Sequence, residues 1–82
     1  MKHTNYFSYV KIRPDRALIK EKWIQETIEN PIKTVVQSDG RLRKWSYIGE
    51  ENKYLRVVTL NDGETVHNAF FDRSYKEGNG ED

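Results

Sequence analysis

The chain has no cysteine, only two histidines and no long apolar segment. Without cysteine there is no disulfide and no thiolate metal cluster, as is usual for proteins of the cytoplasm. His3 and His67 are too few to build a metal site unless carboxylates complete it, and no spacing indicates one. No apolar run approaches the roughly 20 residues that cross a bilayer, and residues 1–5 do not begin a secretory signal. We therefore expect a cytoplasmic protein with no metal, no cofactor and no membrane partner.

The chain also lacks an excess of either charge, since it has 14 Lys and Arg residues and 13 Asp and Glu residues. A formal net charge of +1 neither requires nor excludes a nucleic-acid partner. The distribution is more informative, because cations gather between residues 41 and 73 while the C-terminus is acidic. The cations of this region are Arg41, Arg43, Lys44, Lys53, Arg56 and Arg73. The sequence therefore predicts a locally basic surface.

With 82 residues the chain is expected to form one α+β domain over residues 1–75, with a disordered tail at 76–82 that has no apolar side chain. Aromatic and β-branched residues at 6–12 predict a first strand. Apolar residues near helical spacing predict one main helix between Asp15 and Asn30, interrupted near Ile19 and ended by Pro31. Four strands are predicted after it, at residues 33–37, 41–48, 53–60 and 64–71. Short turns between them predict a mostly antiparallel meander of four to five strands, packed on the helix.

Asp62-Gly63 separates two alternating apolar runs and predicts a tight hairpin. A two-residue loop pairs Thr59 with Val66, Val58 with His67, Val57 with Asn68 and Arg56 with Ala69. Arg56 and His67 then lie diagonally on one face, about 7 to 8 Å apart. On this register Leu55, Val57, Val66 and Phe70 form one apolar face, which we take as the core face. The opposite face, with Val58, Leu60 and Phe71, is also partly apolar and is the alternative. A phosphate group could be bound by the paired guanidinium and imidazole.

Strand 41–48 also has two distinct sides. Arg41, Arg43, Trp45 and Tyr47 alternate on one side, while the other side carries Leu42, Lys44, Ser46 and Ile48. We take Arg41, Arg43, Lys44, Trp45 and Tyr47 as candidate nucleic-acid-binding residues, because arginines bind phosphate and aromatic rings stack on unpaired bases. Packing of Trp45 and Tyr47 in a core, and solvation of the cations at an edge, are the structural alternatives.

Tyr-Leu-Arg-Val-Val at 54–58 and Phe-Asp-Arg-Ser-Tyr at 71–75 resemble motifs of the RelE and BrnT superfamily of bacterial toxins. The resemblance covers roughly residues 41–75, and the single helix before the sheet is closer to BrnT. It implies a small ribonuclease that is neutralised by an antitoxin protein. By this resemblance Arg56 contacts the scissile phosphate, and Arg73 and Tyr75 complete the site.

RNA cleavage requires a base for the 2′-hydroxyl proton, cations for the developing phosphorane and an acid for the leaving 5′-oxygen. His67 is the candidate base or acid, and a neighbouring arginine would favour its neutral form. The candidate catalytic residues are therefore His67, Arg56, Arg73 and Tyr75. Incidental surface roles for His67 and Arg56 are the alternative.

Two functions follow from the sequence. The first is a metal-independent endoribonuclease toxin with RNA as substrate and an antitoxin as partner. The second is a non-catalytic domain that binds nucleic acid or a protein through the basic sheet face. The sequence leaves the oligomeric state open.

Overall fold

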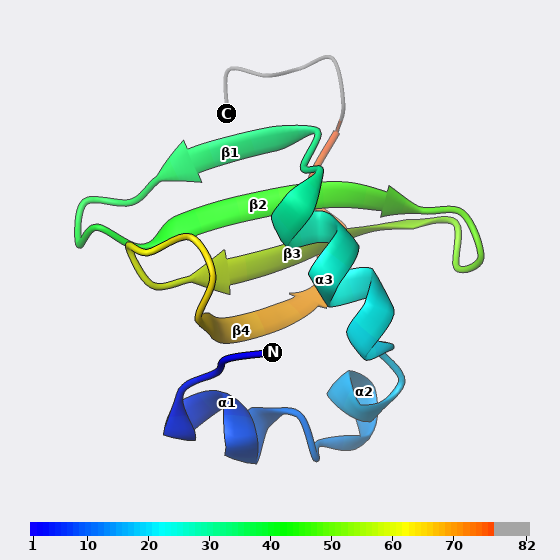
Figure 1. Cartoon of the computed structure of the whole chain (residues 1–82). Helices are drawn as coiled ribbons and strands as arrows, with labels where there is room; N and C mark the ends of the chain where they lie inside the picture. The colour runs from blue at the N-terminus through cyan, green and yellow to red at the C-terminus, as the bar shows by residue number, and fades with distance from the viewer. Residues whose placement is uncertain (77–82) are drawn as a thin grey trace.

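The structure is a computed structural model that describes residues 1–76. Helices α1 (Asn5–Val10), α2 (Pro14–Ala17) and α3 (Glu21–Glu29) precede strands β1 (Lys33–Val36), β2 (Leu42–Ile48), β3 (Lys53–Thr59) and β4 (Val66–Phe71). Figure 1 shows α3 lying across one face of the sheet, with α1 and α2 beyond the edge formed by β4. The predicted disordered tail lies outside the described residues, apart from Lys76.

The four strands form an antiparallel sheet in the order β1-β2-β3-β4, which confirms the predicted meander. Each strand lies within one of the four predicted ranges. Glycine makes two of the connecting turns possible, because Gly40 and Gly63 adopt positive φ angles of 91° and 74°. The protein is thus a small α+β domain.

The core lies between α3 and the sheet. Trp23, Ile24 and Thr27 face the sheet from α3, and all three are buried. From the strands, Leu55, Val57 and Val66 have no exposed surface. Burying a side chain of this size stabilises the fold by about 1.5 to 3 kcal/mol relative to exposure, which explains why this face determines how the sheet packs.

The predicted first strand at 6–12 is wrong, because residues 5–10 form helix α1. The Thr4 hydroxyl caps this helix by accepting a hydrogen bond from the Phe7 amide at 3.2 Å. Phe7 and Val10, three residues apart, are buried against the core. A cap and one apolar face therefore outweigh the strand propensity of these aromatic and β-branched residues.

The predicted main helix is two helices. Chain 14–17 forms α2, and α3 begins at Glu21, so the interruption falls near Ile19 as predicted. The Lys20 backbone is extended, with φ −72° and ψ 140°. This extended residue separates α2 from α3 and lets α3 start in a new direction. Among the described residues, no helix is long and apolar enough to cross a membrane.

The register of the last hairpin contains a β-bulge. Thr59 pairs with Val66 as predicted, but Val58 pairs with Asn68, Val57 with Ala69 and Arg56 with Phe70. The predicted pairs Val58–His67, Val57–Asn68 and Arg56–Ala69 are therefore wrong. His67 is the additional residue, because a bulge places two residues of one strand opposite one residue of its partner.

The bulge exchanges the two faces of β4 beyond His67. Ala69 is buried in the core and Phe71 packs against it, whereas Phe70 pairs with Arg56 on the opposite face. The prediction that Phe70 belongs to the core is therefore wrong. The bulge occurs where residues 2–4 pair with the outer side of Val66. The Val66 amide donates to the Lys2 carbonyl at 2.9 Å, and the Thr4 amide donates to the Val66 carbonyl at 2.9 Å.

Candidate functional site

We call the sheet surface opposite α3 the open face. Residues paired in register point to the same side of a sheet, so the positions of this face follow from the strand pairing. They are Lys33 and Val35 of β1, Arg43, Trp45 and Tyr47 of β2, Tyr54, Arg56 and Val58 of β3, and Asn68 and Phe70 of β4. This set agrees with the predicted cationic and aromatic side of β2.

Asp72, immediately after β4, organises the open face. Its Oδ2 accepts hydrogen bonds from Trp45 Nε1 at 2.9 Å and from Arg56 Nε and Nη2 at 3.0 and 2.8 Å. Its Oδ1 accepts from the Ser74 hydroxyl at 2.6 Å and the Ser74 amide at 3.0 Å. One carboxylate therefore links β2, β3 and the segment after β4.

These bonds keep the Asp72 carboxylate ionised. Burial alone would raise its pKa, but hydrogen bonds from Ser74, Trp45 and Arg56 outweigh burial and hold the pKa well below its usual range. The Asp72 side chain is only 6% exposed, and the Arg56 side chain is 22% exposed. The guanidinium predicted to contact phosphate is therefore already paired with a buried anion.

Aromatic rings continue the cluster across the open face. Tyr75 stacks on Trp45 with ring centroids 5.1 Å apart, and Tyr54 contacts Tyr75 at 4.9 Å and Tyr47 at 5.1 Å. Trp45 is 5% exposed beneath these groups, whereas Tyr47 is 47% exposed. In this arrangement Trp45 supports the surface, and Tyr47 presents a ring to solvent.

Phe70 lies between two guanidinium groups. Arg56 is 4.9 Å and Arg16 is 5.2 Å from the centroid of its ring, within the range of cation–π contacts. Arg16 Nη1 also donates to Asn68 Oδ1 at 2.7 Å and to the Ala69 carbonyl at 3.4 Å. Arg16 thereby connects α2 to the β4 edge of the open face.

His67 belongs to a different cluster from Arg56. Its Nδ1 is 3.1 Å from the Thr4 hydroxyl, and its ring stacks on Tyr6 with centroids 4.8 Å apart. Burial lowers its pKa, the positive charge of Arg41 lowers it further, and Asp39 opposes both. The structure therefore surrounds His67 with the N-terminal segment and Arg41, while Arg56 has Asp72, Trp45 and Phe70 as neighbours.

The remaining predicted residues divide between the two faces. Arg43 donates from Nε to Gln37 Oε1 at 3.0 Å, and Arg41 pairs with Asp39 at 3.6 Å near the β1–β2 turn. Lys44 points to the α3 side, where Nζ donates to the carbonyls of Ile28 and Gly63 at 3.1 and 3.2 Å. It therefore joins α3 to the β3–β4 turn, on the face opposite Arg43.

A shallow cavity of about 180 Å³ opens beside the Asp72 cluster. Among the described residues, its charged lining is one carboxylate, Asp72, and four cations: Lys33, Arg43, Arg56 and Lys76. Trp45 and Tyr75 contribute aromatic surface. Pockets for drug-sized ligands occupy about 300 to 1,000 Å³, so this cavity suits a smaller anionic group. We refer to it as the basic cavity.

Sequence analysis did not identify Asp72, Arg16 or Thr4 as members of these clusters. Asp72-Arg-Ser74 has the Asx-turn pattern, in which an aspartate accepts from an amide two residues on, so Asp72 left a local signal. Arg16 contacts a residue 52 positions away, and Thr4 one 63 positions away. No local pattern predicts contacts across such separations.

Among the described residues, no group of three or more His, Asp or Glu side chains is arranged to hold a metal ion. Arg73 is exposed immediately after Asp72, and Tyr75 lies over Trp45. Comparisons with protein-family models, with curated proteins and with solved structures find no match to this chain. The resemblance of residues 41–75 to the RelE and BrnT toxins stays a prediction.

Proposed function

We propose that the open face binds single-stranded RNA without cleaving it. The observation that carries the proposal is the basic cavity, a space of about 180 Å³ that four cations, two aromatic residues and one carboxylate line within the part of the chain that the structure describes. A space of this size suits a phosphate group with part of its sugar. Cations that follow a backbone beside aromatic rings are the common elements of single-strand binding.

The contacts indicate different roles for the cations. Arg56 is paired with Asp72, which largely neutralises its charge. It therefore contributes more by fixing the geometry of the cavity than by a direct contact with phosphate. Arg43 donates from Nε to Gln37 and is one of the residues that line the basic cavity. Arg41, with a side chain 41% exposed, extends the basic surface toward His67. Tyr47 is the exposed ring on which an unpaired base can stack.

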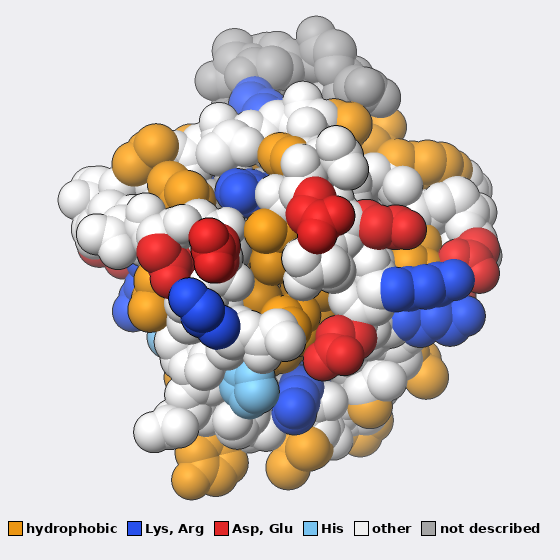
Figure 2. Space-filling model, in the orientation of Figure 1, with side chains coloured by type: hydrophobic (Ala, Val, Ile, Leu, Met, Phe, Trp, Pro, Cys, Tyr) orange, Lys and Arg blue, Asp and Glu red, His pale blue; other side chains and the backbone are white. Residues whose placement is uncertain are grey.

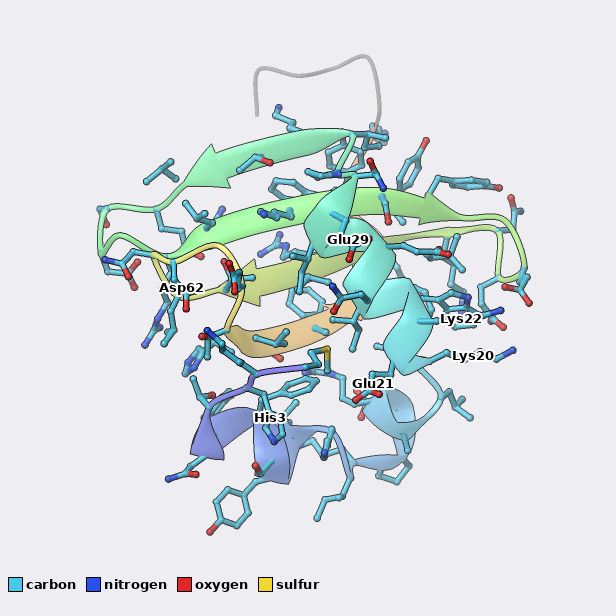
Figure 3. The ribbon with its side chains drawn as sticks, in the orientation of Figure 1. His3, Lys20, Glu21, Lys22, Glu29 and Asp62 are labelled. Atoms are coloured by element: carbon cyan, nitrogen blue, oxygen red, sulfur yellow. The ribbon has the colours of Figure 1, made fainter. Side chains whose placement is uncertain are left out.

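The test is fluorescence anisotropy of a labelled 12-nucleotide single-stranded RNA, titrated with the full chain between 50 and 200 mM salt. We expect Arg43→Glu to weaken binding at least fivefold and to reduce the salt slope by about 0.7 for each phosphate that the variant no longer neutralises. Lys22→Glu is the matched control, because it makes the same change in net charge on α3, the helix on the opposite side of the sheet (Figure 3).

Equal losses of affinity for Arg43→Glu and Lys22→Glu would mean that net charge alone causes binding, and would contradict the proposal. Absence of binding by the folded wild-type chain at 50 mM salt would also contradict it. A DNA strand of the same sequence serves as a comparison, because only RNA carries the 2′-hydroxyl.

Cleavage is the second candidate function, and the environment of His67 favours it. Its lowered pKa leaves the imidazole neutral near pH 7, with the charge of Arg41 nearby. In the tautomer that is protonated at Nδ1, this N–H donates a hydrogen bond to the Thr4 hydroxyl. Nε2 then has a lone pair that can take the 2′-hydroxyl proton. The resulting 2′-oxygen attacks phosphorus, the bond from phosphorus to the 5′-oxygen breaks, and that oxygen takes a proton from solvent while the His67 imidazolium returns its proton to solvent. The products are a 2′,3′-cyclic phosphate and a 5′-hydroxyl.

Cleavage and binding are distinguished by incubating the RNA with the chain in the presence of EDTA. A metal-independent toxin yields cyclic phosphate ends, and His67→Gln abolishes the products while RNA binding persists. A toxin also arrests growth when it is expressed without an antitoxin, and His67→Gln relieves that arrest. Intact RNA and normal growth with the wild-type chain would leave binding alone as the function.

A further inference from the structure

A second cavity lies at the end of the sheet where β3 begins and β4 ends, two segments that Figure 1 shows side by side. We call it the end cavity, and its volume is about 250 Å³. In the described chain, its lining combines two cations, Lys53 and Arg73, with the aromatic side chains of Tyr54, Phe71 and Tyr75. Like the basic cavity, it is smaller than the pockets that hold drug-sized ligands, so it suits one small group of a larger ligand.

The end cavity is basic because its cations have no carboxylate partner. Within the part of the chain that the structure describes, neither Lys53 nor Arg73 forms an ion pair. The only carboxylate in the described lining belongs to Asp72, and it is paired with Arg56. Lys53 Nζ lies 5.2 Å from the centroid of the Phe71 ring, within the range of a cation–π contact. Two cations beside an acid that is already paired favour an anionic ligand.

The end cavity and the basic cavity share a wall, which is the turn at Asp72–Tyr75. The side chains of Asp72 and Tyr75 line both cavities. The Tyr75 amide donates to the Asp72 carbonyl at 3.4 Å and closes the turn, while the Asp72 amide donates to the Tyr54 carbonyl at 2.8 Å and joins the turn to β3. The Tyr75 ring is stacked on Trp45. The shared wall is therefore held in place, and a ligand that occupies both cavities crosses Tyr75.

Carboxylates change the character of the surface beyond the end cavity. A further cavity of about 380 Å³ is also lined by Lys53 and Arg73, but its lining includes Asp15 and Glu51. Asp15 is paired with Arg16 at 3.3 Å, whereas Glu51 is exposed and forms no ion pair among the described residues. These carboxylates repel a polyanion, so the surface that favours one ends at the end cavity.

We propose that the end cavity is a second phosphate-binding subsite for RNA, with Lys53 and Arg73 as its phosphate ligands. The inference rests on the proposed function, because the basic cavity binds another phosphate of the same strand. Between the two subsites the strand crosses the rings of Tyr54 and Tyr75. Cations along the backbone with aromatic rings beside them are the usual means of binding a single strand. Trp23 lies outside the described lining of both cavities, so this path does not bring RNA into contact with it.

The test repeats the anisotropy titration of the 12-nucleotide RNA with Lys53→Glu and with Arg73→Glu in the full chain. We expect each variant to weaken binding at least threefold and to reduce the salt slope by about 0.7, as for one phosphate that is no longer neutralised. Lys53→Arg keeps the charge and should bind as the wild-type chain does. Lys22→Glu is again the matched control. Lys53 and Arg73 are exposed, so the variants should keep the wild-type circular dichroism spectrum.

A double variant, Arg43→Glu with Lys53→Glu, determines whether the two cavities bind different phosphates. Separate phosphates predict that the salt slope falls by about 1.4, the sum of the two single reductions. A double variant that binds RNA as well as Arg43→Glu alone would overturn the inference, because the two cations would then act at one phosphate.

Failure of this inference is distinct from failure of the proposed function. If Arg43→Glu weakens binding while Lys53→Glu behaves like Lys22→Glu, the second subsite is wrong and the RNA-binding open face stands. If Arg43→Glu behaves like Lys22→Glu, the basic cavity does not bind RNA, and both proposals are contradicted. Absence of RNA binding by the folded wild-type chain at 50 mM salt would likewise contradict both.

Discussion

At the scale of single residues, Asp72 is the group on which the open face depends. We expect Asp72→Asn to lower the free energy of unfolding by about 2 kcal/mol at pH 7, because hydrogen bonds to buried charged groups contribute about 1.5 to 3 kcal/mol. Urea denaturation monitored by circular dichroism measures this. Asp15→Asn is the control, since Asp15 is 71% exposed and its pair with Arg16 should contribute less than about 1 kcal/mol.

The same substitution predicts a change in acid stability. The Asp72 pKa is lowered on folding, so its contribution is fully present above the unfolded pKa of about 3.9 and is lost as pH falls through the lower folded pKa. The wild-type chain should therefore lose more stability than Asp72→Asn between pH 5 and pH 2. Parallel stability curves for the two proteins would show that Asp72 is not the stabilised anion.

His67 provides a second residue-scale prediction, because its neighbours have opposite charges. We expect its NMR titration midpoint to lie below the ordinary value of 6.5. Arg41→Ala should raise the midpoint, since it removes a repelling cation, and Asp39→Ala should lower it further. Midpoints that move in the same direction in both variants would contradict the assigned environment. Below about pH 6.5 the unfolded chain takes up this proton first, so His67 makes stability fall with decreasing pH.

At the scale of secondary-structure elements, the β3–β4 turn depends on a glycine. Gly63 has φ +74°, and an added Cβ would meet only ordinary contacts with Leu42 and Lys44 at 3.5 and 3.7 Å. We expect Gly63→Ala to destabilise the fold by about 1 to 2 kcal/mol through backbone strain alone. Gly49→Ala has no positive φ and no neighbour within 4 Å, so it should be neutral or stabilising by up to about 1 kcal/mol. Thermal denaturation compares the two, and equal shifts would contradict the argument.

The strands and their order could be predicted because local signals define them. Asp62-Gly63 and the other turns lie between alternating apolar runs, and the break near Ile19 is visible in the helical pattern. Helix α1 could not be predicted, because its residues have strand propensity. They form a helix because Thr4 caps it and because Phe7 and Val10 are buried. Burial of Phe7 and Val10 is gained only once the N-terminal segment has docked on β4.

The bulge at His67 explains most of what sequence analysis missed in the candidate site. A single additional residue reverses the alternation, so Phe70 rather than Ala69 reaches the open face beside Arg56. Nothing in Val66-His67-Asn68 indicates this locally. It depends on residues 2–4 pairing with Val66 and on Arg16 reaching Asn68.

At the scale of the whole molecule, the chain has two chemically different sides. The α3 side carries acidic and basic side chains interspersed, as Figure 2 shows, whereas four cations and one carboxylate of residues 1–76 line the basic cavity of the open face. Net charge of +1 conceals this separation. The fold thereby concentrates cations on one surface without making the protein strongly basic.

The two tryptophans report separately on these sides. Trp45 Nε1 donates to Asp72 on the open face, at 2.9 Å, and Trp23 Nε1 donates to Glu50 on the α3 side, also at 2.9 Å. Each indole N–H gives its own signal in a ¹H–¹⁵N correlation spectrum of the full chain. One titration therefore compares the two faces in the same sample.

The most direct measurement is this spectrum during addition of the 12-nucleotide single-stranded RNA. We predict a progressive shift of the Trp45 indole signal that saturates with the anisotropy curve, while the Trp23 signal stays in place. A shift of Trp23 alone, or no shift of either signal at RNA concentrations that saturate binding, would contradict an RNA-binding open face.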